Sequence, residues 1–217
     1  MNKIILFLGI QGSGKGTQAE ILAKSRHIPL LEAGALIRKE IDRKTNLGNF
    51  IRSYSEKGIL IPDKQIEKIL INNIRKMGHP KKIIIDGFPR IVEQIEVLYH
   101  IEKFLGAKKI ITIFLKMSKN DAIKRLSDRL ICVKCNKIYS KTIDKITICP
   151  KCNSKLIKRE DDTGKAIKKR LEVFEKETIP VIEKLKEKSD FIEIDATGSI
   201  EKISKIIDRK VKKILSQ

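Results

Sequence analysis

The residues best suited to do chemistry lie near the start of the chain, in the segment Gly9-Ile-Gln-Gly-Ser-Gly-Lys-Gly-Thr17. Its glycines allow successive backbone N–H groups to face one anion, and Lys15 can reach the outer phosphates of a nucleotide. The spacing fits Gly-x4-Gly-Lys, but Gly16 stands where most such loops carry a Mg²⁺-binding hydroxyl, and the hydroxyl follows at Thr17. An apolar run before this loop and a helical pattern after it favour a nucleotide-phosphate site over a simple glycine turn.

A second motif contains all four cysteines, as Cys132-Val-Lys-Cys135 and Cys149-Pro-Lys-Cys152 with 13 residues between the pairs. Two Cys-x2-Cys knuckles can supply four thiolates in a tetrahedron, which suits a structural Zn²⁺ and leaves no open coordination position for catalysis. The spacing is slightly shorter than the usual 15–20 residues. Iron in the same site and a cluster without metal are the alternatives.

A third motif, Ile83-Ile-Ile-Asp86-Gly-Phe-Pro-Arg90, ends an apolar strand in a carboxylate. Strand ends of this kind lie at the edge of a parallel sheet where ligands bind, so Asp86 is expected to organise Mg²⁺. The alternative is a residue that only caps the next helix. Phosphoryl transfer also needs positioned cations. The candidate arginines are Arg38, Arg90, Arg125, Arg129, Arg159 and Arg170.

The elements that must position these residues alternate along the chain. Short β-branched apolar runs predict buried parallel strands at 3–8, 28–31, 82–85, 109–115 and 191–194. Helical patterns cover 17–26, 63–77, 91–105, 118–130, 163–188 and 200–215, with Ser118 as an N-cap and Asp121 three residues on. This alternation predicts an α/β fold with a doubly wound parallel sheet. Two segments interrupt it: 32–61, which contains helices but no strand, and 129–162, which contains the cysteines.

Composition is consistent with one α/β domain with insertions. The chain has 217 residues, of which 41% are hydrophobic and 34% charged. Apolar runs stay far below the roughly 20 residues of a membrane span, and the short run at 4–8 lacks the features of a signal peptide, so we expect a cytoplasmic protein without a membrane partner. The net charge of +20 could indicate nucleic-acid binding. The basic residues are scattered, however, with no Trp and only 3 Tyr for base stacking, so we expect no nucleic-acid partner.

With these motifs in place, the chain closely resembles the adenylate kinases, specifically the bacterial type with a zinc-bearing lid, over nearly its whole length. The phosphate loop matches that family's loop, including the unusual Gly16, and Asp86-Gly-Phe-Pro-Arg90 followed by Gln94 matches its monophosphate signature. The remaining matching segments are Arg125-Leu-Ser-Asp-Arg129, Arg159-Glu-Asp-Asp162, Arg170 eleven residues after Arg159, and Gly58-Ile-Leu-Ile-Pro-Asp63.

The resemblance implies a P-loop kinase core with a five-stranded parallel sheet and two insertions. The core would comprise residues 1–31, 62–127 and 163–217, the helical monophosphate-binding domain residues 32–61, and a zinc-ribbon-like lid residues 128–162. The family also implies a monomer that uses ATP with Mg²⁺ and AMP, and converts them reversibly to two ADP.

The resemblance also assigns site residues. The catalytic group would be Lys15, Asp86, Arg90, Arg129, Arg159 and Arg170. ATP would be held by Gly12, Ser13, Gly14, Lys15, Gly16, Thr17, Arg125, Arg129, Ile138, Tyr139 and Gly198. AMP would be held by Ala33, Arg38, Ile59, Leu60, Ile61, Gly87, Phe88, Pro89, Arg90, Gln94, Arg159 and Arg170.

The chain departs from the family at two places. The usual Thr-Gly-Asp reads Ala33-Gly34-Ala35, and Leu130 replaces a second arginine. Ala33 favours an alternative, a UMP- or CMP-preferring kinase of the same fold, whereas Gln94 can pair with the edge of adenine. One lost hydroxyl contact is worth only about 0.5–1.5 kcal/mol, and a base-edge site discriminates by more, so AMP is the expected acceptor. The alternative of a different class is a zinc-ribbon nucleic-acid-binding protein.

Overall fold

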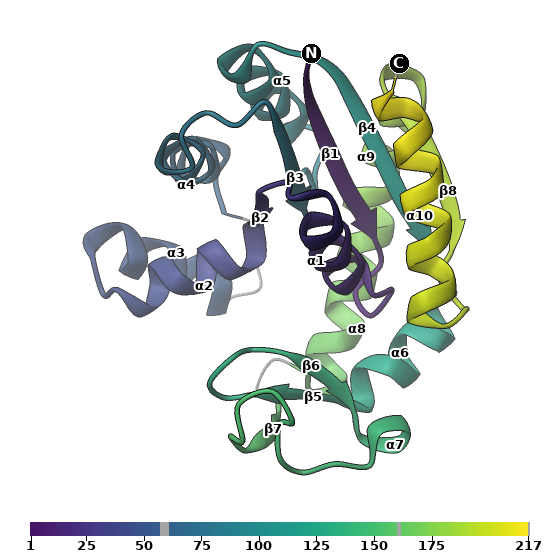
Figure 1. Cartoon of the computed structure of the whole chain (residues 1–217). Coiled ribbons are helices and arrows are strands. Elements are labelled where there is room, and N and C mark those ends of the chain that lie inside the picture. Colours follow the sequence, from purple (N-terminus) through teal and green to yellow (C-terminus); the bar gives the residue numbers. More distant parts are fainter. Residues whose placement is uncertain (57–60, 160–161, 217) are drawn as a thin grey trace.

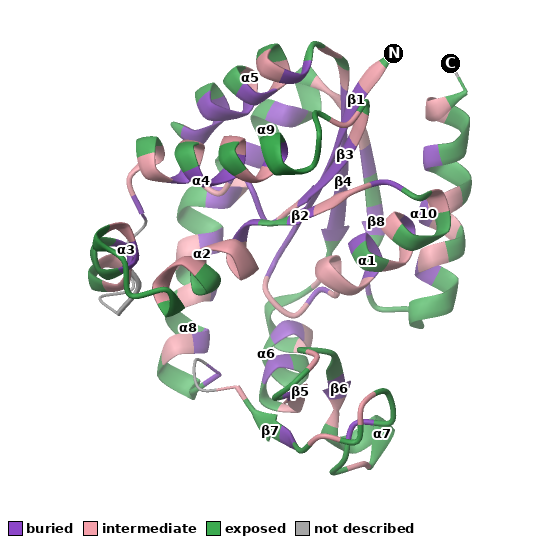
Figure 2. Cartoon of the chain, turned by 60° about the vertical axis from the view of Figure 1, so that its left-hand side comes forward, coloured by how far each residue is buried: buried purple, intermediate pink, exposed green. Residues whose placement is uncertain are grey.

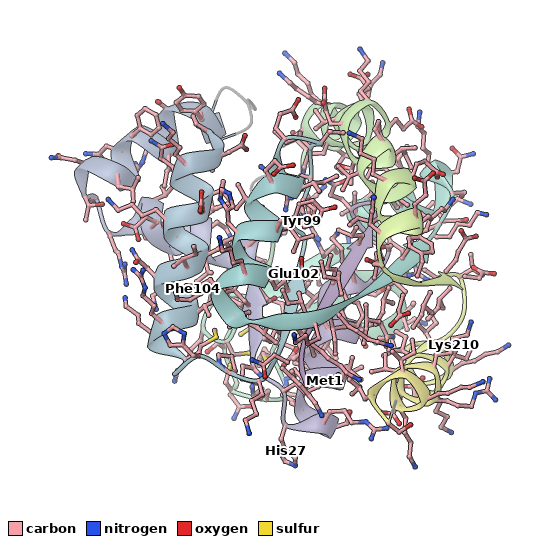
Figure 3. All side chains as sticks on the ribbon, turned by 90° about the horizontal axis from the view of Figure 1, so that it is seen from above. Met1, His27, Tyr99, Glu102, Phe104 and Lys210 are labelled. Atoms are coloured by element: carbon pink, nitrogen blue, oxygen red, sulfur yellow. The ribbon has the colours of Figure 1, made fainter. Side chains whose placement is uncertain are left out.

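The computed structural model of the protein describes residues 1–56, 61–159 and 162–216. Among these residues, no helix combines the length and the apolar character that crossing a membrane requires. Side chains that end in nitrogen point outward on all sides of Figure 3, as expected for a net charge of +20 that is spread over the surface.

The central element is a five-stranded parallel sheet, with strands in the order β2-β3-β1-β4-β8 (Figure 1). The strands are β1 (Asn2–Gly9), β2 (Leu30–Glu32), β3 (Lys82–Asp86), β4 (Ala107–Lys116) and β8 (Asp190–Asp195). From β1 the chain crosses to β2 on one side of the sheet, and from β3 it crosses over to β4 on the other side of β1. The carboxyl end of β1 is therefore the point where ligands bind in open α/β sheets. The predicted doubly wound sheet is confirmed.

Alternation along β1 explains why helices cover both faces. Ile4, Leu6 and Leu8 belong to one hydrophobic cluster, and Ile5 and Phe7 belong to the other. The second cluster is closed by α1 (Lys15–Arg26) and α10 (Ile200–Leu215). The first is closed by α4 (Asp63–Lys76), α5 (Gln94–Leu105) and α9 (Ile179–Lys188). Both faces of the sheet are consequently buried, as the purple strands of Figure 2 show.

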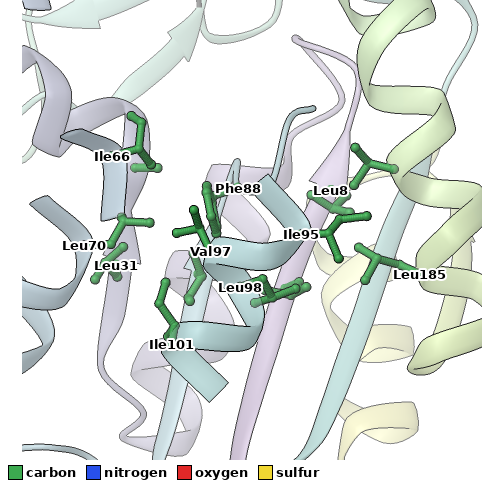
Figure 4. Packing of buried hydrophobic residues seen from close by; sticks show 14 of the residues in the cluster. Leu8, Leu31, Ile66, Leu70, Phe88, Ile95, Val97, Leu98, Ile101 and Leu185 are labelled. Atoms are coloured by element: carbon green, nitrogen blue, oxygen red, sulfur yellow. The ribbon is translucent and has the colours of Figure 1, made fainter. Parts of the chain in front are cut away.

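The packing of the first cluster is seen from close by in Figure 4. Ile95 of α5 lies beside Leu8 of β1 and Leu185 of α9, and Leu98 follows further along α5. Leu98 and Leu185 are fully buried, so this layer holds α5, and the loop that precedes it, firmly against the sheet.

Two groups of elements extend away from the five-stranded sheet. Helices α2 (Ala33–Asp42) and α3 (Asn46–Glu56) follow β2 and pack on each other. Strands β5 (Arg129–Cys132), β6 (Ile138–Ser140) and β7 (Leu156–Lys158) form an antiparallel sheet in the order β6-β5-β7, joined by the short α7 (Lys141–Asp144). In Figure 1 this small sheet lies beyond the carboxyl ends of the core strands.

Several predicted boundaries need correction. The predicted helix 91–105 begins only at Gln94, and the strand predicted at 28–31 is Leu30–Glu32, so segment 32–61 does contain one strand residue. The helix predicted at 118–130 is α6 (Lys119–Ser127), because the chain enters β5 at Arg129. Its N-cap is confirmed: Ser118 Oγ accepts from the backbone N–H of Asp121 at 3.1 Å.

The segment 163–188 is not one regular helix. It consists of α8 (Gly164–Val173), a π-helical turn η1 (Phe174–Thr178) and α9. The hydrophobic pattern predicted one continuous helix here. A single π-helical turn does not change the spacing of apolar residues enough to be recognised in the sequence.

Candidate functional site

The phosphate loop connects β1 to α1 without a capping side chain. Gly14 occupies the N-cap in the left-handed region, at φ 86°, and among the described residues no side chain caps α1. Helices leave their first N–H groups unpaired, so those of α1 remain available to an anion. The loop can therefore bind phosphate through its backbone, as its glycines predict.

The replacement of the usual hydroxyl residue by Gly16 has a physical reason in the fold. A methyl group at Gly16 would lie 3.2 Å from Asp86 Oδ2 and 3.9 Å from Glu32 Oε1. Asp86 reaches this place because β3 pairs with β1, with Asp86 opposite Phe7 and the N–H of Gly87 donating to the Phe7 carbonyl at 3.1 Å. The sheet thus brings a carboxylate against the first turn of α1.

Lys15 and Asp86 have opposite charges and share a crowded site. Burial lowers the pKa of Lys15 to about 8; the charge of Asp86 opposes this effect, and those of Arg90 and Arg129 add to it. Burial likewise raises the pKa of Asp86, against the charges of Lys15 and Arg90. Asp86 Oδ1 is buried and has no hydrogen-bond partner among the described residues. An unpaired carboxylate oxygen beside a phosphate loop fits a hydrated Mg²⁺, which prefers such ligands.

Arg90 is fixed by several hydrogen bonds. Its Nε donates to the Gly87 carbonyl at 2.9 Å, and its backbone N–H donates to Gln94 Oε1 at 2.9 Å. A methyl group at Gly34 would lie 3.4 Å from Arg38 Nη1 and 3.7 Å from Arg90 Nη2. The guanidinium groups of Arg38 and Arg90 therefore both lie beside the start of α2, near the end of β3.

The other described residues of the predicted AMP site named here are buried. Ala33 is 4% exposed and packs in the core at the start of α2, and Gln94 is also 4% exposed. Phe88 is 2% exposed within the same core, so its backbone rather than its ring is available to a ligand. Ile61 is buried, whereas Ile59 and Leu60 lie outside the described residues.

A buried carboxylate joins two of the predicted catalytic arginines. Asp162 accepts from Arg129 Nε and Nη2, both at 2.7 Å, and from Arg170 Nη2 at 3.0 Å. The Asp162 side chain is 0% exposed, and those of Arg129 and Arg170 are 14% and 25% exposed. Asp162 thus holds an arginine of β5 beside an arginine of α8. In the sequence, Asp162 is indicated only as the last residue of the motif Arg159-Glu-Asp-Asp162.

The residues predicted around ATP are only partly brought together. Arg125 of α6 lies near the phosphate loop, 4.0 Å from a methyl group built on Gly14, and the charge of Arg159 acts on Lys15. Gly198 lies in the loop between β8 and α10. Ile138 is 46% exposed and Tyr139 is 9% exposed, so these neighbours on β6 face opposite ways.

The cysteines form one cluster, with all four Sγ atoms within 4.8 Å of one another. Cys132 Sγ lies 3.4 Å from Cys152 Sγ, and Cys135 Sγ lies 3.6 Å from Cys149 Sγ. Sulfur atoms about 2.3 Å from a tetrahedral zinc are separated by about 3.8 Å, whereas a disulfide bond is only about 2.05 Å long. The thiols are free, and the arrangement is compatible with zinc.

One residue outside the cluster makes a hydrogen bond to one of its sulfur atoms. Tyr139 Oη is 3.2 Å from Cys149 Sγ. Burial acts against the thiolate of Cys149, but the bond from Tyr139 and backbone N–H groups outweigh it and lower the pKa of Cys149 to about 6. A low thiol pKa favours the thiolate that binds metal. The hydroxyl of Tyr139 therefore serves the cysteine cluster, a contact that the sequence did not indicate.

Comparisons with known proteins agree with this geometry. The family model described as adenylate kinase matches residues 7–190. A protein named adenylate kinase from Dehalococcoides mccartyi is 33% identical over 212 residues, which are 96% of this chain and 97% of that protein. Adenylate kinases from Rickettsia bellii (37% identical; 96% of this chain and 99% of the relative) and Thermoanaerobacter sp. (35% identical; 92% and 93%) are also similar.

Proposed function

The chain belongs to the adenylate kinase family of phosphotransferases, and we propose that it transfers the γ-phosphoryl group of ATP to AMP in a reversible reaction that gives two ADP. The observation that carries this proposal is the convergence of three groups at the carboxyl ends of β1 and β3. These groups are the ammonium of Lys15, the carboxylate of Asp86 and the guanidinium of Arg90. A phosphate loop, a metal-binding carboxylate and a second anion site are the parts that phosphoryl transfer between two nucleotides needs.

The chemistry of the chain in this reaction is electrostatic. The loop N–H groups and Lys15 would bind the phosphates of ATP, and Arg90 with Arg38 would bind the phosphate of AMP. Arg129, Arg159 and Arg170 would neutralise charge on the group in transfer. When bound through Asp86 and water, Mg²⁺ would supply further neutralisation of the ATP phosphates. Direct in-line transfer needs no covalent intermediate on the protein, and no cysteine outside the cluster could act as a nucleophile.

The two insertions would complete the nucleotide sites. We assign residues 32–61 to the AMP side and residues 128–162 to a lid over ATP, with residues 1–31, 62–127 and 163–217 as the core. Closing both over the nucleotides would exclude water, which otherwise competes with AMP for the phosphoryl group. The position of Arg38 on α2 beside Arg90, and of Arg129 on β5 beside Arg170, supports this division.

The assigned ATP site comprises Gly12, Ser13, Gly14, Lys15, Gly16, Thr17, Arg125, Arg129, Ile138, Tyr139 and Gly198. The assigned AMP site comprises Ala33, Arg38, Ile59, Leu60, Ile61, Gly87, Phe88, Pro89, Arg90, Gln94, Arg159 and Arg170. The contact of Gln94 with the Arg90 backbone supports a fixed amide at the base end of this site. We further assign a structural Zn²⁺ to Cys132, Cys135, Cys149 and Cys152, and a monomeric state to the protein.

A coupled assay tests the reaction. ADP formation is measured with Mg²⁺-ATP and each of AMP, CMP, UMP and GMP as acceptor. We expect the highest kcat/KM with AMP. A higher kcat/KM with UMP or CMP would instead establish a pyrimidine-preferring kinase, consistent with Ala33. No turnover with any of the four would contradict the proposed kinase and favour the zinc-ribbon nucleic-acid-binding alternative.

A further inference from the structure

The irregular turn between α8 and α9 follows from a proline. Pro180 has no N–H to donate to the carbonyl of Lys176, four residues earlier, and its ring would crowd that carbonyl. The chain widens at this point instead, and the N–H of Ile179 bonds to the carbonyl of Phe174, five residues earlier. Single π-helical turns of this kind occur frequently at functional sites.

The last residue of this turn makes a contact that reaches across the molecule. Thr178 is 7% exposed, and its Oγ1 donates to the carbonyl of Arg90 at 2.9 Å, 88 positions away in the sequence. The carbonyl of Arg90 lies in the irregular segment between β3 and α5, where no strand or helix partner is expected for it. A threonine in a regular helix usually bonds within its own helix or faces solvent. Here its hydroxyl binds another segment of the core.

This bond completes the fixation of the Arg90 backbone. The Arg90 N–H donates to the side chain of Gln94, and its carbonyl accepts from the side chain of Thr178. The guanidinium is then oriented by the bond from Nε to the Gly87 carbonyl. Both backbone polar groups of Arg90 are thus held by side chains of two different elements, and its Nη2 lies beside Gly34 and Gly87.

We propose that Thr178 is a positioning residue for the phosphate of the acceptor nucleotide, acting through the backbone of Arg90. This inference rests on the proposed function, because Arg90 is the assigned ligand of that phosphate. The helical segment that contains Thr178 continues α8, which carries Arg170. One continuous segment therefore sets the position of two arginines, Arg170 directly and Arg90 through the Thr178 hydroxyl.

A positioning role and a purely structural role differ in what they change. Loss of a hydroxyl that only stabilises the core would lower the melting temperature and leave substrate affinity alone. Loss of a hydroxyl that orients Arg90 would weaken binding of the acceptor and leave binding of ATP alone. The KM values of the two substrates therefore separate the two roles.

The test uses the full-length protein and three substitutions. Thr178→Val removes the hydroxyl at nearly constant volume, and Thr178→Ser keeps it. Thr112→Val is the matched control, because Thr112 is 0% exposed on β4 and its Oγ1 accepts from Ser189 Oγ at 2.7 Å, away from Arg90. Thr178→Ala provides a second variant without the hydroxyl, should the valine prevent folding.

With Thr178→Val or Thr178→Ala, we expect the KM for AMP to rise about three- to tenfold, as for one lost buried hydrogen bond. The KM for ATP should stay within about twofold, and Thr178→Ser should restore the KM for AMP to within about the same range. Thr112→Val should lower the melting temperature without changing the KM for AMP.

An unchanged KM for AMP in both hydroxyl-free variants, an equal rise in the KM for ATP, or an equal rise in Thr112→Val would overturn the inference. Each of these results leaves the proposed function intact, since the wild-type enzyme still converts AMP. Absence of turnover in the wild type would refute the proposed function, and the inference with it.

Discussion

The substitution Gly16→Ala is expected to separate the stability of the protein from its activity. It adds one methyl group in the first turn of α1, where the backbone is helical. Replacing a helical glycine with alanine stabilises a protein by roughly 0.5–1 kcal/mol, because alanine loses less conformational freedom on folding. From the helix alone, the variant should be at least as stable as the wild type.

The added methyl group also contacts the carboxylate of Asp86. It would lie 3.2 Å from Asp86 Oδ2, closer than the 3.4–4 Å of ordinary contacts, so the carboxylate must move by a few tenths of an ångström. A misplacement of about 1 Å at a catalytic group can cost about 100-fold in rate. We therefore expect kcat to fall by about three- to tenfold, and the Mg²⁺ concentration for half-maximal rate to rise.

The assay measures kcat at saturating ATP and AMP, its dependence on Mg²⁺, and the urea midpoint of unfolding. Gly164→Ala is the matched control, because Gly164 is the first residue of α8 and a methyl group there would have nothing within 4 Å. It should gain similar stability and keep the wild-type kcat. If Gly16→Ala turned over as fast as Gly164→Ala, the close approach of Asp86 to the phosphate loop would have no catalytic meaning.

Four further predictions concern the lysine, the cysteine cluster and the buried carboxylate. Lys15→Ala should keep the far-ultraviolet circular dichroism of the wild type and lower kcat by about two to four orders of magnitude, the scale of about 2.7–4 kcal/mol or more for a lost transition-state donor; near-normal turnover would exclude the assigned role. Lys15 loses its charge as the pH rises through its lowered pKa of about 8, so kcat/KM for ATP should fall above about pH 8; a profile still level near pH 10 would contradict either the lowered pKa or the need for this charge. The purified protein should contain about one Zn²⁺ by elemental analysis, and a chelator or Cys149→Ser should lower the melting temperature without abolishing the circular dichroism of the core; full metal content in Cys149→Ser would rule out a four-thiolate site. Asp162→Asn should lower the free energy of unfolding by about 3 kcal/mol, the low end for a broken buried ion pair because Arg129 and Arg170 remain 14% and 25% exposed; an unchanged urea midpoint would argue against the bridge.

The sequence by itself determined the features whose parts are close along the chain. The phosphate loop could be recognised because its glycines and Lys15 lie within one turn and the start of one helix. The cysteine cluster could be recognised because the two cysteines of each Cys-x2-Cys pair are close in the sequence. Only the approach of one pair to the other depends on the fold. The parallel sheet followed from β-branched runs alternating with helical patterns, since buried strands and amphipathic helices each impose a local period.

Tertiary structure decided which distant groups meet. The proximity of Asp86 to Gly16 depends on β3 pairing with β1, and the bridge from Asp162 to Arg129 and Arg170 depends on how β5 lies beside α8. The bond from Thr178 to Arg90 depends on a π-helical turn, which the spacing of hydrophobic residues does not predict. Local patterns report which face of an element is buried, but the partner of a buried polar group is chosen by strand order and helix docking. These contacts therefore appear only once the chain is folded.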